Sequence, residues 1–131
     1  MIGFDTNILV RYLAQDDPIQ SPRATRIVDH LFTEDHPGFI SLVTIAETVW
    51  VLRSIYRMPD DAVATAIEQL LQADTLFIQN EREVFTAMMA LRTGEASFPD
   101  ALIGALGAWA GCTTTLTFDK KAARLCSFRL V

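Results

Sequence analysis

The apolar positions of this chain alternate between two spacings along its length. Short apolar runs of strand length stand at residues 1–4, 39–43, 75–79, 113–118 and 127–131. Between these runs, apolar residues recur every three or four positions, which predicts helices over residues 8–13, 18–33, 44–56, 60–71, 80–94 and 97–111. We therefore expect an α/β fold, a three-layer α/β/α sandwich with a mostly parallel central sheet of four to five strands, because strands alternating with helices favour that arrangement.

Two of the predicted helices begin with the capping-box pattern, in which a hydroxyl residue is followed three positions later by an acidic one. Thr44 and Glu47 form one such pair, and Ser97 and Asp100 form the other. The pattern places both acidic residues in the first turn of a helix. The helix over residues 18–33 has one apolar face, made of Ala24, Ile27, Val28, Leu31 and Phe32.

Composition narrows the class of protein only a little. The 131 residues carry 11 basic and 16 acidic side chains, a net charge of −5, which is unlike a protein that holds nucleic acid by charge alone. The chain has no apolar stretch long enough to span a membrane and no signal-peptide pattern at its start, so we expect a cytoplasmic protein. Cys112 and Cys126 form no metal-type pair, and we expect both to be reduced core residues.

Four acidic residues stand at related places in the predicted elements. Asp5 and Asp119 follow apolar strands, while Glu47 and Asp100 begin helices. Parallel strands bring such positions to one edge of a sheet. Two carboxylates about 5 Å apart repel by roughly 3 kcal/mol at an effective dielectric near 20, so the cluster needs a cation. Oxygen ligands favour Mg²⁺ or Mn²⁺ over Zn²⁺, and these ions promote phosphodiester cleavage.

Helix capping is the competing interpretation of these carboxylates. Each of them, taken singly, suits a position at or near a helix start. Capping does not explain why the apolar strands near both ends of the chain finish in Asp. Asn7 is a candidate to hold Asp5 in place, or is a simple helix-start residue, and Thr117 stands in the same relation to Asp119.

Four segments of the chain carry a resemblance to a known family. They are Asp5-Thr6-Asn7, Ser41-Leu42-Val43-Thr44-Ile45-Ala46-Glu47, Phe98-Pro99-Asp100-Ala101-Leu102-Ile103 and Thr117-Phe118-Asp119. In this order, and spread over nearly the full length, they resemble PIN-domain ribonucleases and, more narrowly, the VapC toxins of type II toxin–antitoxin modules. The resemblance implies a single PIN-like domain over residues 1–131 with the activity of a metal-dependent endoribonuclease.

The resemblance also implies roles for the matching residues. Asp5 and Asp100 would be the principal ligands of Mg²⁺ or Mn²⁺, Glu47 would bind the metal directly or through water, and Asp119 would complete the four-carboxylate site. One or two ions would activate a water for in-line attack on RNA, leaving a 5′-phosphate and a 3′-hydroxyl. The supporting residues of the site would be Asn7 and Thr117.

Partners follow from the same resemblance. A VapC-like protein would act on RNA, pair with a cognate antitoxin and form a homodimer. Candidates for contacts to the RNA backbone are Arg11, Lys120 and Lys121, with Arg53, Arg57 and Arg124, although a solvated face also accounts for them. Apolar residues that serve either a partner surface or the core are Trp50, Leu52, Ile55, Val63, Ile67 and Leu70.

Three other functions stay open at this point. A Mg²⁺-dependent phosphatase of the haloacid dehalogenase type needs a second Asp two residues after the first, where this chain has Asn7. A phosphoryl-accepting receiver domain needs adjacent acidic residues, which Asp5 and Thr6 do not supply. A PIN-like module that binds RNA or an antitoxin without cleavage would need an activity assay to distinguish it.

Overall fold

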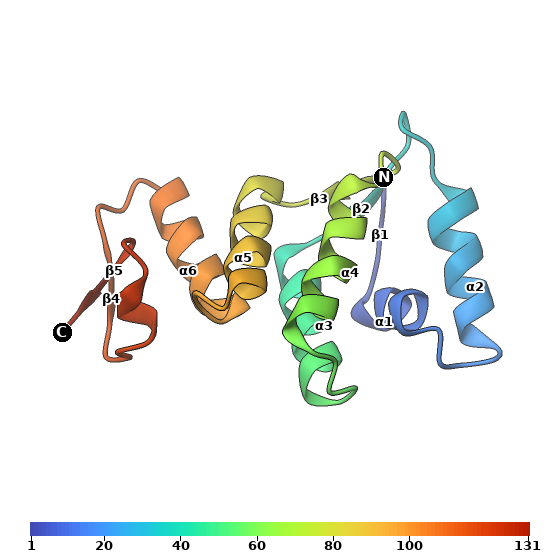
Figure 1. Ribbon diagram of the computed structural model, residues 1–131. Helices are drawn as coiled ribbons and strands as arrows, with labels where there is room; N and C mark the ends of the chain where they lie inside the picture. Colours follow the sequence, from blue (N-terminus) through green and yellow to red (C-terminus); the bar gives the residue numbers. More distant parts are fainter. The chain divides into compact units, whose positions relative to one another are not determined.

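The structure is a computed structural model that describes all residues from 1 to 131 (Figure 1). Its elements, in chain order, are β1 Ile2–Gly3, α1 Thr6–Ala14, α2 Gln20–Arg26, the π-helix η1 Ile27–Leu31, β2 Gly38–Ile40, α3 Leu42–Ser54, α4 Asp60–Gln72, β3 Leu76–Ile78, α5 Glu81–Thr93, α6 Phe98–Trp109, β4 Thr115–Thr117, the 3-10 helix η2 Ala122–Arg124 and β5 Phe128–Leu130. The chain forms two compact units, here called unit 1 (Met1–Glu81) and unit 2 (Arg82–Val131), and each is described by itself.

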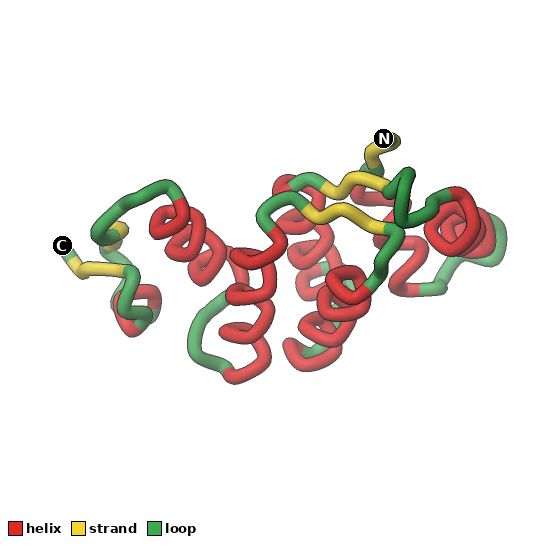
Figure 2. The backbone as a smooth tube through the Cα atoms, turned by 90° about the horizontal axis from the view of Figure 1, so that it is seen from above, coloured by secondary structure: helices red, strands yellow, loops and turns green.

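The sheet of unit 1 is parallel, with the strand order β1-β2-β3. Figure 2 shows two of the strands of this unit running side by side. Gly3 pairs with Phe39, and the N–H of Phe4 donates to the carbonyl of Phe39 at 3.0 Å, which extends the ladder one residue past β1. The carboxyl ends of the three strands therefore lie at one edge, where Asp5 follows β1 and Ser41 follows β2. Helices and parallel strands confirm the expected α/β class.

The helices of unit 1 pack in sequence around this sheet. Helix α1 contacts α2 and α3, α3 contacts α4, and α4 contacts β3. Four apolar residues for which a partner surface or the core was expected are buried in the core, namely Leu52, Val63, Ile67 and Leu70. Trp50 of α3 and Ile55, the C-cap of that helix, are instead exposed, so only these two of the set remain available to a partner.

A close aromatic contact fixes the end of β1. The rings of Phe4 and Phe32 meet edge to face, with centroids 5.0 Å apart, against the backbone of Gly38 in β2. A Cβ atom at Gly38 would lie 2.9 Å from Cζ of Phe4 and 3.0 Å from Cε2 of Phe32. Glycine is therefore needed at this position, since any larger residue would displace a buried ring. Phe4 is the residue directly before Asp5.

The start of α3 differs from the expected capping box. Ser41 is the N-cap, and its Oγ accepts from the N–H of Thr44 at 3.2 Å. The helix thus begins three residues before the expected cap, because Ser41 comes directly after β2 and is itself a good capping residue. The Thr44 hydroxyl instead donates to the carbonyl of Phe4 at 3.4 Å. Glu47 consequently lies in the second turn of α3, and the prediction that it occupies the first turn is wrong.

The predicted helix over residues 18–33 is also modified. It begins as α2 and continues as the π-helix η1, in which each turn contains more residues than an α-helical turn. The wider turn rotates the following side chains away from the positions that α-helical spacing predicts. Leu31, expected on the apolar face, is 57 % exposed, whereas Phe32 is buried.

Unit 2 contains α5, α6 and a second parallel sheet. Strands β4 and β5 pair from Thr115 with Phe128 to Thr117 with Leu130, so the five strands form two sheets rather than the one central sheet expected. Each strand is only two or three residues long, and a few backbone hydrogen bonds decide which strands share a sheet. Helix α6 approaches this sheet closely, since a Cβ at Gly107 would lie 2.7 Å from Oγ1 of Thr115.

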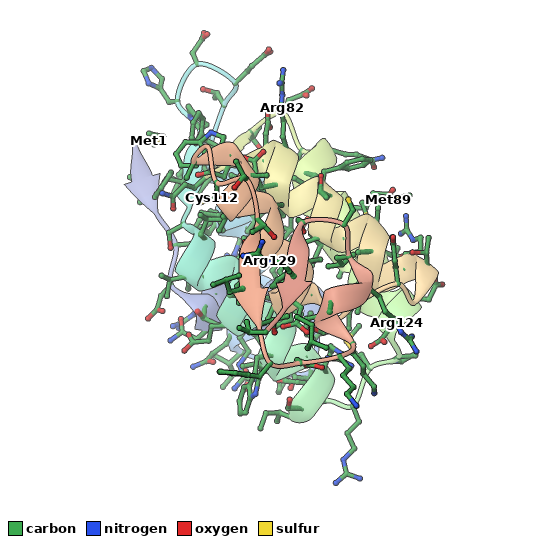
Figure 3. All side chains as sticks on the ribbon, turned by 90° about the vertical axis from the view of Figure 1, so that its left-hand side faces the viewer. Met1, Arg82, Met89, Cys112, Arg124 and Arg129 are labelled. Atoms are coloured by element: carbon green, nitrogen blue, oxygen red, sulfur yellow. The ribbon has the colours of Figure 1, made fainter.

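The two cysteines of the chain lie in unit 2. Cys112 and Cys126 are free and exposed, so the expectation that they belong to the core is wrong. Cys112, labelled in Figure 3, follows the end of α6, and Cys126 precedes β5, where the chain runs along the surface of unit 2. None of the helices combines the length and apolar character that a membrane span requires.

Candidate carboxylate site

Asp5 stands at the junction of β1 and α1. It is the N-cap of α1, with extended backbone angles, and its Oδ1 accepts from the N–H of Thr6 at 2.7 Å. The capping interpretation is therefore correct for this residue. The second carboxylate oxygen accepts no hydrogen bond, and the side chain is exposed. Capping leaves Asp5 with an oxygen free to bind a ligand.

Glu47 lies on α3 and lines the same pocket as Asp5. The hydrogen bond from Thr44 to the carbonyl of Phe4 holds the start of α3 beside the end of β1, and Glu47 follows less than one turn later. A pocket of about 410 Å³ lies between α1 and α3, lined by Asp5, Thr6, Asn7, Val10, Arg11, Glu47, Val51, Ile55 and Tyr56. Unit 1 thus places Asp5 and Glu47 in one pocket, which we call the carboxylate pocket.

Arg11 also lines the carboxylate pocket, but its guanidinium is bonded to residues other than Asp5 and Glu47. Its Nη1 donates to both oxygens of Asp16 at 3.1 Å and to the hydroxyl of Tyr56 at 3.2 Å. Its Nε donates to Oε1 of Gln20 at 2.8 Å. Tyr56 in turn donates to Asp16 at 2.7 Å. Neither Asp5 nor Glu47 forms an ion pair with this guanidinium, so the charge of the two carboxylates is not neutralised by it.

The hydrogen bonds around Arg11 also shift the pKa values of Asp16 and Tyr56. The hydrogen bond from Tyr56 lowers the pKa of Asp16, and the hydrogen bonds and charge of Arg11 lower it further. The same Asp16 raises the pKa of Tyr56. Sequence reasoning missed both neighbours of Arg11: Asp16 is only five residues away, just past the end of α1, whereas Tyr56 is 45 residues away and no spacing rule connects it with Arg11. Only the packing of α1 against α3 brings them together.

The other two predicted site residues lie in unit 2. The N–H of Asp100 donates to Oγ of Ser97, the N-cap of α6, at 3.2 Å, which confirms the predicted helix start. The carboxylate of Asp100 is half-buried and accepts no hydrogen bond. The N–H of Asp119 donates to Oγ1 of Thr117 at 3.0 Å. Thr117 therefore contacts the residue that it was expected to orient.

Two local contacts complete the description of the predicted residues. Oδ1 of Asp119 accepts from the N–H of Lys121 at 2.8 Å, and the side chains of Lys120 and Lys121 are exposed. In unit 1, the side chain of Asn7 lines the carboxylate pocket and makes no hydrogen bond with Asp5. Its expected role in holding Asp5 remains a prediction.

The donor set of the carboxylate pocket fits a hard divalent cation. Within each unit, no three Asp, Glu, His or Cys side chains gather into a metal-binding group. The pocket nevertheless contains carboxylate oxygens of Asp5 and Glu47 that have no cationic partner, and Mg²⁺ is commonly bound by one or two carboxylates together with waters and substrate phosphates. The four-carboxylate site remains a prediction, because two of its members belong to each unit.

Comparison with known families identifies the class of protein. The PIN-domain model matches residues 2–127, which cover most of both units and include all four predicted site residues. The chain therefore belongs to the PIN-domain family. Members of this family are generally nucleases, so the fold is that of a nuclease acting on nucleic acid. None of the curated proteins compared with the chain matches it.

Proposed function

We propose that this protein is a divalent-metal-dependent endoribonuclease. The observation that carries the proposal is the carboxylate pocket, where Asp5 and Glu47 from two separate elements line one cavity of a PIN-family chain. Two carboxylates without a cationic partner in one pocket repel each other, and a divalent cation relieves that repulsion. The pocket is open to solvent at both carboxylates, which gives an RNA strand access to them.

The residues of the chain have distinct tasks in this proposal. Asp5 and Glu47 would hold the metal, and Asp100 and Asp119 would complete its ligand set. The N–H of Thr6 fixes the orientation of Asp5, so that its free oxygen points away from the cap. When bound there, Mg²⁺ or Mn²⁺ would lower the pKa of a coordinated water and would offset negative charge on a phosphate oxygen. Asn7 supports the ligands from its position beside Asp5.

We further propose that the nuclease is the toxin of a VapBC-type pair, with a cognate antitoxin and a homodimer as its partners. The segments that resemble VapC toxins support the toxin assignment. Exposed apolar side chains on α3 and at its C-cap support a protein partner, since Val43, Trp50 and Ile55 are 77 %, 59 % and 63 % exposed. Co-purification of the protein with the product of a neighbouring antitoxin-sized gene, lost on Trp50→Glu, would test this part.

The nuclease assignment is tested by cleavage of total cellular RNA. Wild type, Asp5→Asn and Glu47→Gln are compared in Mg²⁺, in Mn²⁺ and in EDTA. We expect discrete products that require metal, and a loss of at least about 100-fold in each variant, because even indirect partners of a metal change activity by roughly 10–100-fold.

Matched controls for this experiment come from the same unit. Asp35→Asn and Glu34→Gln make the same chemical changes at exposed carboxylates that line no pocket described above, and both should cleave like wild type. Binding of Mn²⁺ should raise the melting temperature of wild type more than that of Asp5→Asn. Unchanged cleavage in both Asp5→Asn and Glu47→Gln, or full activity in EDTA, would contradict the proposal.

A further inference from the structure

A second pocket adjoins the carboxylate pocket in unit 1. It has a volume of about 250 Å³ and is lined by Asn7, Ile8, Arg11, Gln20, Arg23, Ala24 and Ile27. Asn7 and Arg11 line both pockets, so the two cavities meet at these side chains. The second pocket lies between α1 and α2, which pack against each other.

The guanidinium of Arg11, a residue that lines both pockets, is held by three side chains. Its Nη1 is held by Asp16 and Tyr56, and its Nε is held by Gln20. Nη2 makes no hydrogen bond with the protein. Because three partners define the plane of the group, the two hydrogens of Nη2 have a fixed direction. A guanidinium held in this way is well suited to bind a phosphate oxygen.

The chemistry of the second pocket differs from that of the first. No carboxylate lines it, while Arg11 and Arg23 do, and Arg23 forms no ion pair. Ile8, Ala24 and Ile27 provide an apolar wall. The amide nitrogens of two side chains, Asn7 and Gln20, remain free to donate. Positive charge, an apolar wall and amide donors together match a nucleotide, which has an anionic phosphate, a flat ring and ring-edge acceptors.

We propose that this pocket, here called the nucleotide subsite, binds the nucleotide next to the phosphodiester that is cleaved. Arg11 binds the phosphate between the two pockets, Arg23 binds the following phosphate or stacks on the base, and the wall formed by Ile8 and Ile27 receives the base. The inference rests on the proposed nuclease function and deepens it. It also gives an acidic chain a local contact for the RNA backbone, since Arg23 forms no ion pair and Arg11 keeps Nη2 free of hydrogen bonds with the protein.

Two residues act in this proposal through Arg11. Asp16 and Tyr56 contact its guanidinium and each other, and Tyr56 also lines the carboxylate pocket. They are positioning residues, which hold the direction of Nη2. Loss of the Tyr56 hydroxyl should therefore weaken RNA binding only while Arg11 is present.

The first test measures binding of a fluorescein-labelled single-stranded RNA of mixed sequence to Asp5→Asn, which keeps the RNA intact. In this background we compare Arg11→Gln, Arg11→Lys and Arg23→Gln by fluorescence anisotropy over a range of salt concentrations. Arg11→Gln and Arg23→Gln should each weaken binding by at least about tenfold. Each should also reduce the slope of log K against log salt by about 0.7, the value for one lost phosphate contact on a single strand.

Arg11→Lys and a further variant, Arg26→Gln, separate the effect of charge on RNA binding from the effect of side-chain position. Arg11→Lys keeps the positive charge but loses the planar, forked set of N–H donors that the guanidinium provides. The affinity for RNA should therefore fall, while the slope of log K against log salt stays near that of the parent. Arg26→Gln makes the same change of charge as Arg23→Gln on the same helix, at an exposed side chain that lines neither pocket. This control should bind RNA like the parent.

The second test is a double-mutant cycle. Tyr56→Phe should raise KM for RNA cleavage while leaving kcat nearly unchanged, and it should weaken RNA binding in the Arg11 parent but have no further effect in Arg11→Gln. Melting temperatures verify that each variant is folded. A structural role of Tyr56 would instead lower the melting temperature without this dependence on Arg11.

The outcomes distinguish the subsite from the nuclease assignment. Metal-dependent cleavage by wild type, with RNA binding unchanged in Arg11→Gln and Arg23→Gln, would overturn the nucleotide subsite and leave the nuclease assignment in place. RNA binding that depends on both arginines supports the subsite whether or not cleavage is found. Absence of any RNA binding by the wild type would overturn the subsite.

Discussion

The contact of Gly38 with Phe4 and Phe32 gives a quantitative prediction for the substitution Gly38→Ala. The new Cβ atom would lie 2.9 Å from Phe4 and 3.0 Å from Phe32, well inside van der Waals contact. Both rings are nearly buried, with 9 % and 6 % of their surface exposed, so neither swings into solvent at low cost. The rings or the backbone of β2 must move instead.

The magnitude follows from two opposing effects. Overpacking of a core costs about 1–3 kcal/mol of unfolding free energy. Replacement of Gly by Ala returns about 0.4–1 kcal/mol, because the unfolded chain loses conformational freedom. We therefore expect a net destabilisation of about 1–2 kcal/mol, which corresponds to a fall in melting temperature of roughly 4–8 °C for a chain of this size.

The assay is urea unfolding followed by circular dichroism, with Gly3→Ala as the matched control. Gly3 lies on the neighbouring strand β1, and a Cβ there would meet its nearest neighbour, the carbonyl oxygen of Phe39, at 3.8 Å, an ordinary contact. The control should be neutral or slightly stabilising. Because Phe4 precedes Asp5, Gly38→Ala should also weaken the stabilisation of the protein by Mn²⁺, whereas Gly3→Ala should not.

A second substitution checks the cause of the effect. Phe32→Leu removes one of the two rings that the new methyl group would meet, so the double variant should be more stable than the sum of the single changes predicts. Equal stability of Gly38→Ala and wild type, or equal losses in Gly38→Ala and Gly3→Ala, would refute the reasoning from ring contact.

Two further predictions concern polar groups of unit 1. The buried hydroxyl of Thr48 has no hydrogen-bond partner, so Thr48→Val should raise the urea midpoint, with a gain of about 1 kcal/mol, whereas Thr44→Val should lower it because that hydroxyl is bonded. Asp16 has a pKa below its ordinary 3.8, so its contribution to stability is fully present above that pH and is lost as the pH falls through the lower folded value. The measurement is the difference in urea midpoint between wild type and Asp16→Asn. This difference should be constant from about pH 7 to about pH 5 and should shrink below about pH 3.8. A difference that widens on acidification would contradict this explanation.

The sequence by itself determined the features that depend on neighbouring residues. The alternation of apolar runs and helical stripes predicted the α/β class and parallel strands, because side-chain periodicity reflects which face of an element is buried. Local capping chemistry predicted Asp5 at the start of α1 and Ser97 at the start of α6. These features need only contacts within a few residues along the chain.

Where two local signals compete, the sequence did not decide. Ser41 and Thr44 both suit a helix cap, and the end of β2 selects Ser41, which moves Glu47 into the second turn. The π-helix η1 likewise shifts the exposed face at Leu31. Both outcomes depend on packing against other elements, which no spacing along the chain reports.

The tertiary structure alone decided which side chains share a pocket. Asp5 and Glu47 are separated by 42 positions in the sequence, and they line one pocket because α3 packs against α1 with the Thr44 hydroxyl bonded to the end of β1. Tyr56 reaches Arg11 and Asp16 because α1 packs against α3. Sequence reasoning selected the carboxylates by their chemistry, but it had no means to find Tyr56, the one residue holding Arg11 that is distant along the chain. Contacts between distant segments follow from how whole helices pack, and that packing is a property of the folded chain rather than of any local pattern.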